Sequence, residues 1–152
     1  MVLMLRVLVL YYSGSGNTEK MARAVAEGLR LSGGVDVDVR YYADAEELAA
    51  YDAIVIGSPT YNRDMPSEIK KTLEGAAAKG INLRGKVGAA FGSYGWSGEA
   101  PGMVLKIMES RLGMHVIKPA LAIKGSPDRS GLEKCVELGK KVAEEMKART
   151  TK

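Results

Sequence analysis

Apolar and polar positions along the chain follow two patterns, one typical of β-strands and one typical of α-helices. Three stretches are almost wholly apolar, which predicts strands covered on both faces of a parallel sheet: 3–12, 53–57 and 86–92. The stretch 35–40 alternates strictly between valine and charged residues, so one of its faces meets solvent and it should form an edge strand. A fifth strand is expected near 120–123, with 114–117 leading into it.

Helical spacing, with apolar residues three or four positions apart, fills the stretches between these strands. Helices are expected at about 18–31, from Pro66 onward, from about Ala100 to Gly113 and after the turn 125–128, with a short helix around 45–50. Strands that alternate with helices in this way predict an α/β fold, a doubly wound, five-stranded parallel sheet with helices on both faces. Right-handed crossovers and the edge character of 35–40 favour the strand order 2-1-3-4-5.

Length and composition fit one globular domain over residues 1–152. No apolar run is long enough to span a membrane and the opening residues are too few for a signal peptide, which predicts a cytoplasmic protein. The one cysteine, Cys135, lies on a helical apolar stripe and is expected to be buried and inert. The one histidine, His115, has no second histidine or cysteine cluster to join, which argues against a metal site.

The net charge is +4, which raises the question of an acidic partner or of nucleic acid. Basic residues are interspersed with acidic ones, as along 133–147, and no basic run is interleaved with aromatic residues. This pattern is typical of a solvated helix face. We therefore expect no nucleic-acid partner, and docking to an acidic protein is the interpretation that remains.

A loop rich in hydroxyl groups and glycine follows the first predicted strand and precedes the first helix: Ser13, Gly14, Ser15, Gly16, Asn17 and Thr18. The first backbone N–H groups of a helix lack internal partners and lie at the positive end of the helix dipole. A phosphate there accepts several N–H bonds without a lysine, glycines let the backbone approach, and the hydroxyl groups add donors. An ordinary capped strand–turn–helix has the same pattern, so the loop alone leaves both interpretations open.

Two commoner phosphate-binding motifs do not fit this loop. A Walker loop needs a lysine after its second glycine, where this chain has Asn17. The dinucleotide fingerprint needs a third glycine, where this chain has Glu19, a bulky acid that opposes binding of a pyrophosphate. What remains is a loop suited to a single terminal phosphate.

Two further loops follow the third and fourth predicted strands and combine small, hydroxyl and aromatic residues: Ser58, Pro59, Thr60, Tyr61 and Asn62, then Ser93, Tyr94, Gly95, Trp96 and Gly98. The carboxyl ends of parallel strands meet at one edge of the sheet, so all three loops should form one site. Flat rings at about a nucleotide's length from a phosphate loop predict a pocket for a phosphorylated planar heterocycle. The alternatives are that Trp96 and Tyr61 are plain loop aromatics or contacts for a partner.

With these three motifs the sequence resembles the flavodoxins, which are FMN-binding electron carriers, over essentially the whole chain. The segment 12–18 resembles the phosphate loop of that family, and 57–62 and 92–98 are closest to the flavodoxin domain of the A-type flavoproteins, or flavo-diiron proteins. The resemblance implies a flavodoxin-like fold of the short-chain type. It also implies a phosphate held within 13–18 and an isoalloxazine ring between 59–62 and 93–98.

The chain departs from that family in three ways. Its length leaves no room for a diiron domain, so reduction of oxygen or nitric oxide would need a separate protein. It is basic where flavodoxins are typically acidic, with Arg63, Lys124 and Arg129 near the expected flavin edge. Its middle loop lacks the glycine that flavodoxins often place beside the flavin, and Asn62 is the residue there that best tolerates a positive φ.

The expected function is therefore that of an FMN-dependent electron-transfer protein, which shuttles electrons between a reductase and acceptor proteins, one candidate acceptor being a separate diiron protein. The sequence shows no nucleophile–base pair and no paired catalytic carboxylates, so no residue is assigned a catalytic role. The alternative is an FMN-dependent NAD(P)H oxidoreductase acting on quinones, which usually needs longer loops. A receiver domain is disfavoured because 11–13 and 57–58 lack the acidic residues that this class requires.

Overall fold

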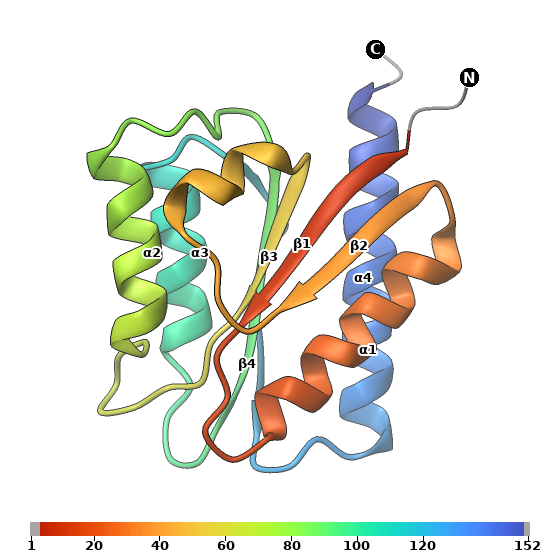
Figure 1. The fold of residues 1–152 in the computed structure, drawn as a ribbon. Helices are drawn as coiled ribbons and strands as arrows, with labels where there is room; N and C mark the ends of the chain where they lie inside the picture. Colours follow the sequence, from red (N-terminus) through yellow and green to blue (C-terminus); the bar gives the residue numbers. More distant parts are fainter. Residues whose placement is uncertain (1–3, 151–152) are drawn as a thin grey trace.

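The computed structural model describes residues 4–150 and shows a parallel sheet with helices on both faces (Figure 1). Its strands are β1 Leu5–Tyr11, β2 Val35–Arg40, β3 Ala53–Gly57, β4 Val87–Tyr94, β5 His115–Val116 and β6 Leu121–Lys124. They pair in parallel in the order β2-β1-β3-β4-β5, with β6 also paired to β4. The predicted doubly wound fold and strand order are confirmed, while the predicted start of the first strand at Leu3 lies outside the described residues.

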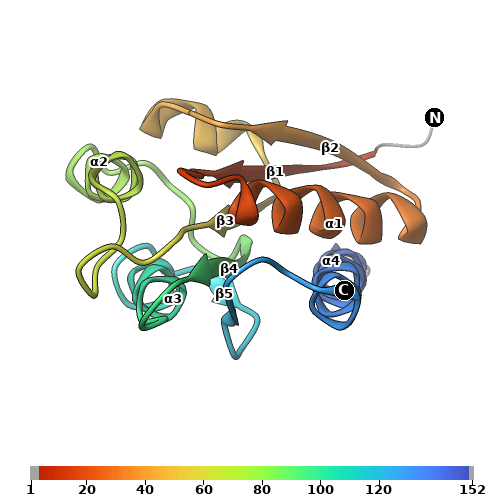
Figure 2. The ribbon, with the colours of Figure 1, turned by 90° about the horizontal axis from the view of Figure 1, so that it is seen from below.

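Helices α1 Asn17–Ser32 and α4 Arg129–Thr150 cover one face of the sheet, and α2 Ser67–Ala78 and α3 Ala100–Ser110 cover the other (Figure 2). The predicted short helix is η1 Ala45–Ala50, a 3₁₀ segment that packs on the same face as α2. Both faces of the sheet are therefore covered, as its continuous apolar strands require.

The two faces carry separate hydrophobic cores because side chains alternate along each strand. From β1, Leu8 and Leu10 pack with α2, α3 and η1, whereas Val7 and Val9 pack with α1 and α4. This division explains why the first strand is an unbroken apolar run. Cys135 of α4 is fully buried in the second of these cores, which confirms its predicted burial.

The fifth position of the sheet differs from the prediction, because two short segments share it. β5 pairs with β4 up to Val116 opposite Gly88, and β6 resumes with Leu121 opposite Phe91. The four residues 117–120 therefore pass only two residues of β4, and the chain leaves the ladder after the Ile117 N–H has bonded to the Gly88 carbonyl at 2.9 Å. Pro119 lies in this excursion and has no N–H to donate, which is a physical reason for the break.

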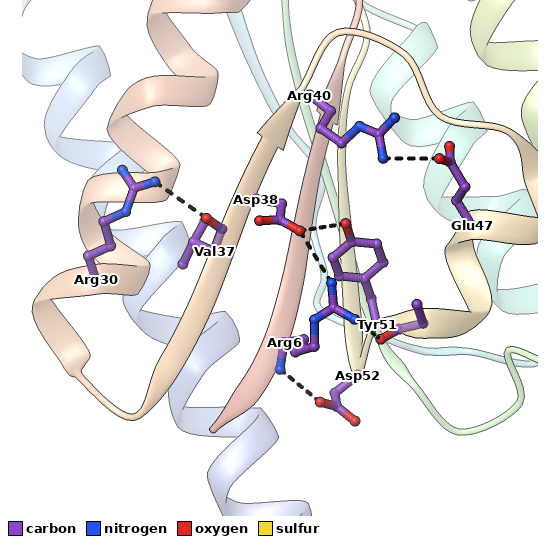
Figure 3. A network of polar contacts seen from close by, with 9 residues as sticks. Arg6, Arg30, Val37, Asp38, Arg40, Glu47, Tyr51 and Asp52 are labelled. Carbon is purple, nitrogen blue, oxygen red and sulfur yellow. Dashed lines mark hydrogen bonds and ion pairs between the residues drawn. The ribbon is translucent and has the colours of Figure 1, made fainter. Parts of the chain in front are cut away.

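The charged face of β2 is less open to solvent than its alternating pattern predicts (Figure 3). Asp38 accepts a hydrogen bond of 2.6 Å from the Tyr51 hydroxyl and pairs with Arg6 at 3.5 Å. The Arg6 guanidinium also lies 4.7 Å from the centre of the Tyr51 ring, and Arg40 pairs with Glu47 of η1 at 3.2 Å. These contacts hold η1 and the residue after it over the edge strand.

The free energy of unfolding is expected to fall as the pH rises above about 9. Burial raises the pKa of the Cys135 thiol to about 12, and burial followed by the hydrogen bond to Asp38 raises the pKa of Tyr51. Because both pKa values are higher in the folded state, the unfolded chain loses these protons first. Their contribution to stability is complete below the unfolded pKa values and is lost as the pH climbs toward the folded ones.

Urea unfolding at steps between about pH 8 and about pH 11 measures this decline. Cys135→Ala should make the decline shallower, because it removes the thiol that ionises in the unfolded chain. A stability that stays level across the range would contradict the raised pKa values.

Candidate functional site

The loops that follow β1, β3 and β4 meet at one edge of the sheet, at the lower end of Figure 1, and enclose a pocket of about 180 Å³. Ten of the residues that the sequence assigned to the site line this pocket: Gly14, Ser15, Asn17, Thr18, Pro59, Thr60, Tyr61, Ser93, Tyr94 and Gly95. Segments far apart in the sequence thus form one cavity, because the carboxyl ends of parallel strands lie together.

Ser13 shapes the first loop through its side chain. Its hydroxyl oxygen accepts hydrogen bonds from the N–H groups of Gly16 at 3.0 Å and Glu19 at 3.3 Å. Gly16 has a φ of 92°, a left-handed conformation that glycine adopts without a Cβ clash, just before α1 begins. In the described part of the chain the N–H groups of Asn17 and Thr18 make no hydrogen bond. Two free donors at the positive end of a 16-residue helix suit a phosphate.

Hydroxyl side chains also tie the loops of the pocket to one another. Thr18 Oγ1 accepts a hydrogen bond of 3.3 Å from the Ser93 N–H, and the Ser93 hydroxyl donates to the Gly125 carbonyl at 2.6 Å. Thr60 Oγ1 accepts from the N–H of Ala100, the first residue of α3, at 3.0 Å. These bonds hold the pocket walls in place, a role that the spacing of these residues in the sequence does not reveal.

Tyr61 and Tyr94 supply the flat side chains of the lining, from opposite loops. The Tyr61 hydroxyl reaches the first loop so closely that a methyl group on Gly14 would collide with it. The Tyr61 ring also meets the Tyr12 ring nearly at a right angle, with 6.2 Å between their centres. Tyr94 packs against Gly98, where a side chain would overlap its ring. The pocket therefore combines anion donors at one side with flat apolar surfaces at the others, which suits a phosphate attached to a planar ring.

Six of the assigned residues lie outside the lining: Ser13, Gly16, Ser58, Asn62, Trp96 and Gly98. Ser58 is fully buried and its hydroxyl donates to the Pro59 carbonyl at 3.0 Å, so it supports its own loop from beneath. Trp96 follows the lining residue Gly95 in the chain and is largely exposed.

Gly125 lines the pocket but was missed by the sequence analysis. It follows β6 with a φ of 70°, donates its N–H to the Tyr94 carbonyl at 2.7 Å and accepts from Ser93. The signal was present, because the carboxyl end of the fifth strand position lies at the same edge as the other three loops. A fourth loop therefore belongs to the site.

Three cationic side chains were expected near this edge, Arg63, Lys124 and Arg129, and they differ in whether a carboxylate neutralises their charge. Arg129 is almost fully exposed and pairs with Glu133 at 3.4 Å, which weakens its field. Within residues 4–150, neither Lys124 nor Arg63 has a carboxylate within 4 Å. These two side chains are the free positive charges beside the pocket.

Among the described residues, no helix is long and apolar enough to cross a membrane. The His, Cys, Asp and Glu side chains of the same residues form no group of three that could hold a metal ion, and His115 pairs instead with Glu145 at 2.9 Å.

Comparison with known proteins gives one consistent match. The sequence model of the flavodoxin family matches residues 9–139. A type A flavoprotein of Rhodobacter capsulatus is 36% identical over 154 residues, which cover 94% of this chain and 34% of that protein. This chain thus spans about a third of the length of that curated relative.

Solved structures agree with the sequence match. A flavodoxin from the domain Archaea superposes with a TM-score of 0.86 at 40% identity, covering 94% of this chain and 99% of the other. The Flv1 flavodiiron core from Synechocystis sp. PCC6803 superposes with a TM-score of 0.83 at 29% identity, covering 97% of this chain and 37% of the other.

Proposed function

The chain belongs to the flavodoxin family, and from that premise we propose that it shuttles electrons between a reductase and acceptor proteins. It is an FMN-binding electron-transfer protein. Because it is similar to a flavodiiron core over part of that protein's length, a separate diiron protein is one acceptor that we propose. We further propose that residues 1–152 work as a single domain in the cytoplasm.

The pocket at the carboxyl ends of β1, β3 and β4 is our proposed FMN site. The free N–H groups of Asn17 and Thr18 would bind the phosphate, with the Ser15 hydroxyl beside them. Tyr61 and Tyr94 would line the two sides of the isoalloxazine ring. Bound FMN supplies the redox chemistry, since it takes up and releases electrons.

A carrier function is favoured over an enzyme by the chemistry of the lining. Among the described residues that line the pocket there is no histidine, cysteine, lysine or carboxylate. The lining consists of glycine, hydroxyl, amide, proline and tyrosine side chains, which bind and orient but do not exchange protons readily near neutral pH. An FMN-dependent NAD(P)H:quinone oxidoreductase is the second candidate, and its only support is that it would use the same cofactor, FMN.

The decisive experiment separates the carrier from the enzyme. Protein loaded with FMN should stay oxidised when NAD(P)H is added alone and should be reduced when a flavodoxin reductase is also present. Direct oxidation of NAD(P)H by the purified protein would favour the oxidoreductase. Failure to retain FMN through gel filtration, after incubation with excess free FMN, would overturn both functions.

Electron transfer to an acidic partner is expected to slow as salt is added. Lys124 and Arg63 are free positive charges beside the pocket, and the chain carries a net charge of +4. Salt screens such charges at distances beyond about 8 Å at physiological ionic strength, so charge-steered association becomes slower. Stopped-flow rates at increasing sodium chloride measure the effect. A rate that is independent of salt would show that charge does not steer docking.

A further inference from the structure

Trp96 is the one tryptophan of the chain, and the residue is 79% exposed. Tryptophan side chains bury a large area when they are packed and are enriched at binding interfaces, so an exposed indole in a loop that lines the pocket is a candidate contact for a ligand. None of the ring–ring contacts among residues 4–150 involves Trp96. Its ring instead meets the guanidinium of Arg63, whose Cζ lies 5.2 Å from the ring centre.

Arg63 is presented by a tight turn in the loop after β3. Tyr61 and Asp64 exchange both backbone hydrogen bonds, at 2.8 and 3.0 Å, and the two residues between them have positive φ values, 50° at Asn62 and 61° at Arg63. This region disfavours an arginine by about 1 kcal/mol. The turn is held from outside, because the Asp64 carboxylate binds Lys70 and accepts a further bond within the loop. The backbone therefore fixes Arg63 beside Trp96 in spite of local strain.

The guanidinium of Arg63 is free to act on the indole. It forms no ion pair within 4 Å in the described part of the chain. Its charge also reaches the Glu99 carboxylate. The pKa of Glu99 is lowered first by a hydrogen bond from Ser97 and, to a smaller extent, by the positive charge of Arg63. A cation over an indole face is attracted by the ring quadrupole, and arginine adds planar stacking to that attraction.

We propose that Arg63 is a positioning residue for Trp96, holding the indole as a preformed wall at the mouth of the FMN pocket. This inference rests on the proposed site. A wall that is ordered before FMN binds lowers the conformational entropy lost on binding, so the part of the flavin that extends beyond Tyr94 packs against the indole at smaller cost. Arg63 thus acts on the cofactor through Trp96, and the strained turn places the Arg63 side chain against the indole.

The first test uses the apoprotein, because a single tryptophan gives an unmixed fluorescence signal when it is excited at wavelengths that the seven tyrosines do not absorb. Arg63→Gln should lower the near-ultraviolet circular dichroism and the fluorescence anisotropy of Trp96, while far-ultraviolet spectra confirm that the variant is folded. Arg111→Gln removes a charge from an exposed arginine after α3 and should leave both signals unchanged. Signals in Arg63→Gln equal to those of the parent protein would overturn the proposal.

The second test is a double-mutant cycle on FMN affinity. Arg63→Gln should raise the FMN dissociation constant about 2- to 5-fold, as expected for an exposed cation–π contact, and Arg63→Lys should raise it less. In the Trp96→Leu background, Arg63→Gln should have no further effect. An equal loss in both backgrounds would mean that Arg63 acts on FMN directly and would overturn the positioning role. If no variant and no parent protein binds FMN, the proposed function fails, while the apoprotein signals still decide the role of Arg63.

Discussion

Gly139→Ala is expected to lower the free energy of unfolding by about 3 kcal/mol. Helices α1 and α4 cross where Gly28 faces Gly139, and each glycine lies against the backbone of the other helix. A Cβ on Gly139 would overlap the Val25 carbonyl oxygen and lie 2.8 Å from the Leu29 nitrogen. Since backbone atoms inside a helix cannot turn aside, the two helices would have to move apart and open the core beneath them.

Helix propensity alone predicts that Gly139→Ala raises the free energy of unfolding. The experiment therefore separates helix propensity from the close packing of the two helices. Alanine in a helix interior is favoured over glycine by about 1 kcal/mol. Gly102→Ala in α3 is the matched control, because nothing lies within 4 Å of its Cβ position and the substitution should stabilise the protein or leave it unchanged. Urea unfolding of both variants measures the difference. A Gly139→Ala protein as stable as the parent would mean that the helices do not cross this closely.

Ser15→Asp is expected to weaken FMN binding about 100-fold or more. Ser15 lines the pocket in the proposed phosphate loop, and a carboxylate there would face the phosphate dianion and compete for the N–H groups of Asn17 and Thr18. Two like charges about 4 Å apart oppose each other by about 4 kcal/mol at an effective dielectric constant of 20, and solvent at this exposed loop reduces that figure. The remaining repulsion still corresponds to about two powers of ten in affinity.

Riboflavin, which lacks the phosphate, separates this effect from damage to the pocket. Its affinity should be the same in Ser15→Asp and in the parent protein, and Ser15→Asn should lose little affinity for either ligand. The free energy of unfolding should not fall in Ser15→Asp, because a carboxylate near a helix N-terminus is favourable by about 0.3–1 kcal/mol. Fluorescence titrations with both flavins measure the outcome. Equal loss of FMN and riboflavin would contradict the placement of the phosphate in this loop.

Features encoded in a short stretch of sequence were predictable. The valines of β2 alternate with charged residues, and this pattern correctly indicated an edge strand. The apolar runs of β1, β3 and β4 indicated a sheet covered on both faces, and with the topology rule they placed three loops at one edge. The free N–H groups at the start of α1 were predictable because a helix N-terminus exposes the same donors in every protein.

Features that depend on distant partners were not predictable. The hydrogen bond between Thr18 and Ser93 joins residues 75 positions apart, and the sequence around either residue does not indicate the other as its partner. The packing of η1 over β2 depends on the hydrogen bond from Tyr51 to Asp38. The break between β5 and β6 was not predicted, although Pro119 is visible in the sequence. Gly125 was overlooked because a turn glycine is common and its position beside Tyr94 comes from strand pairing.

By itself, the sequence determined the strands, the helices, their order in the sheet and the edge at which the loops gather. Those properties follow from backbone periodicity and from the handedness of crossovers, which act over a few residues or apply to every sheet. Only the tertiary structure decided which hydroxyl groups tie the loops together and that Arg63 meets Trp96. Such contacts arise when packing brings separate segments within a few ångströms, and no local pattern carries that information.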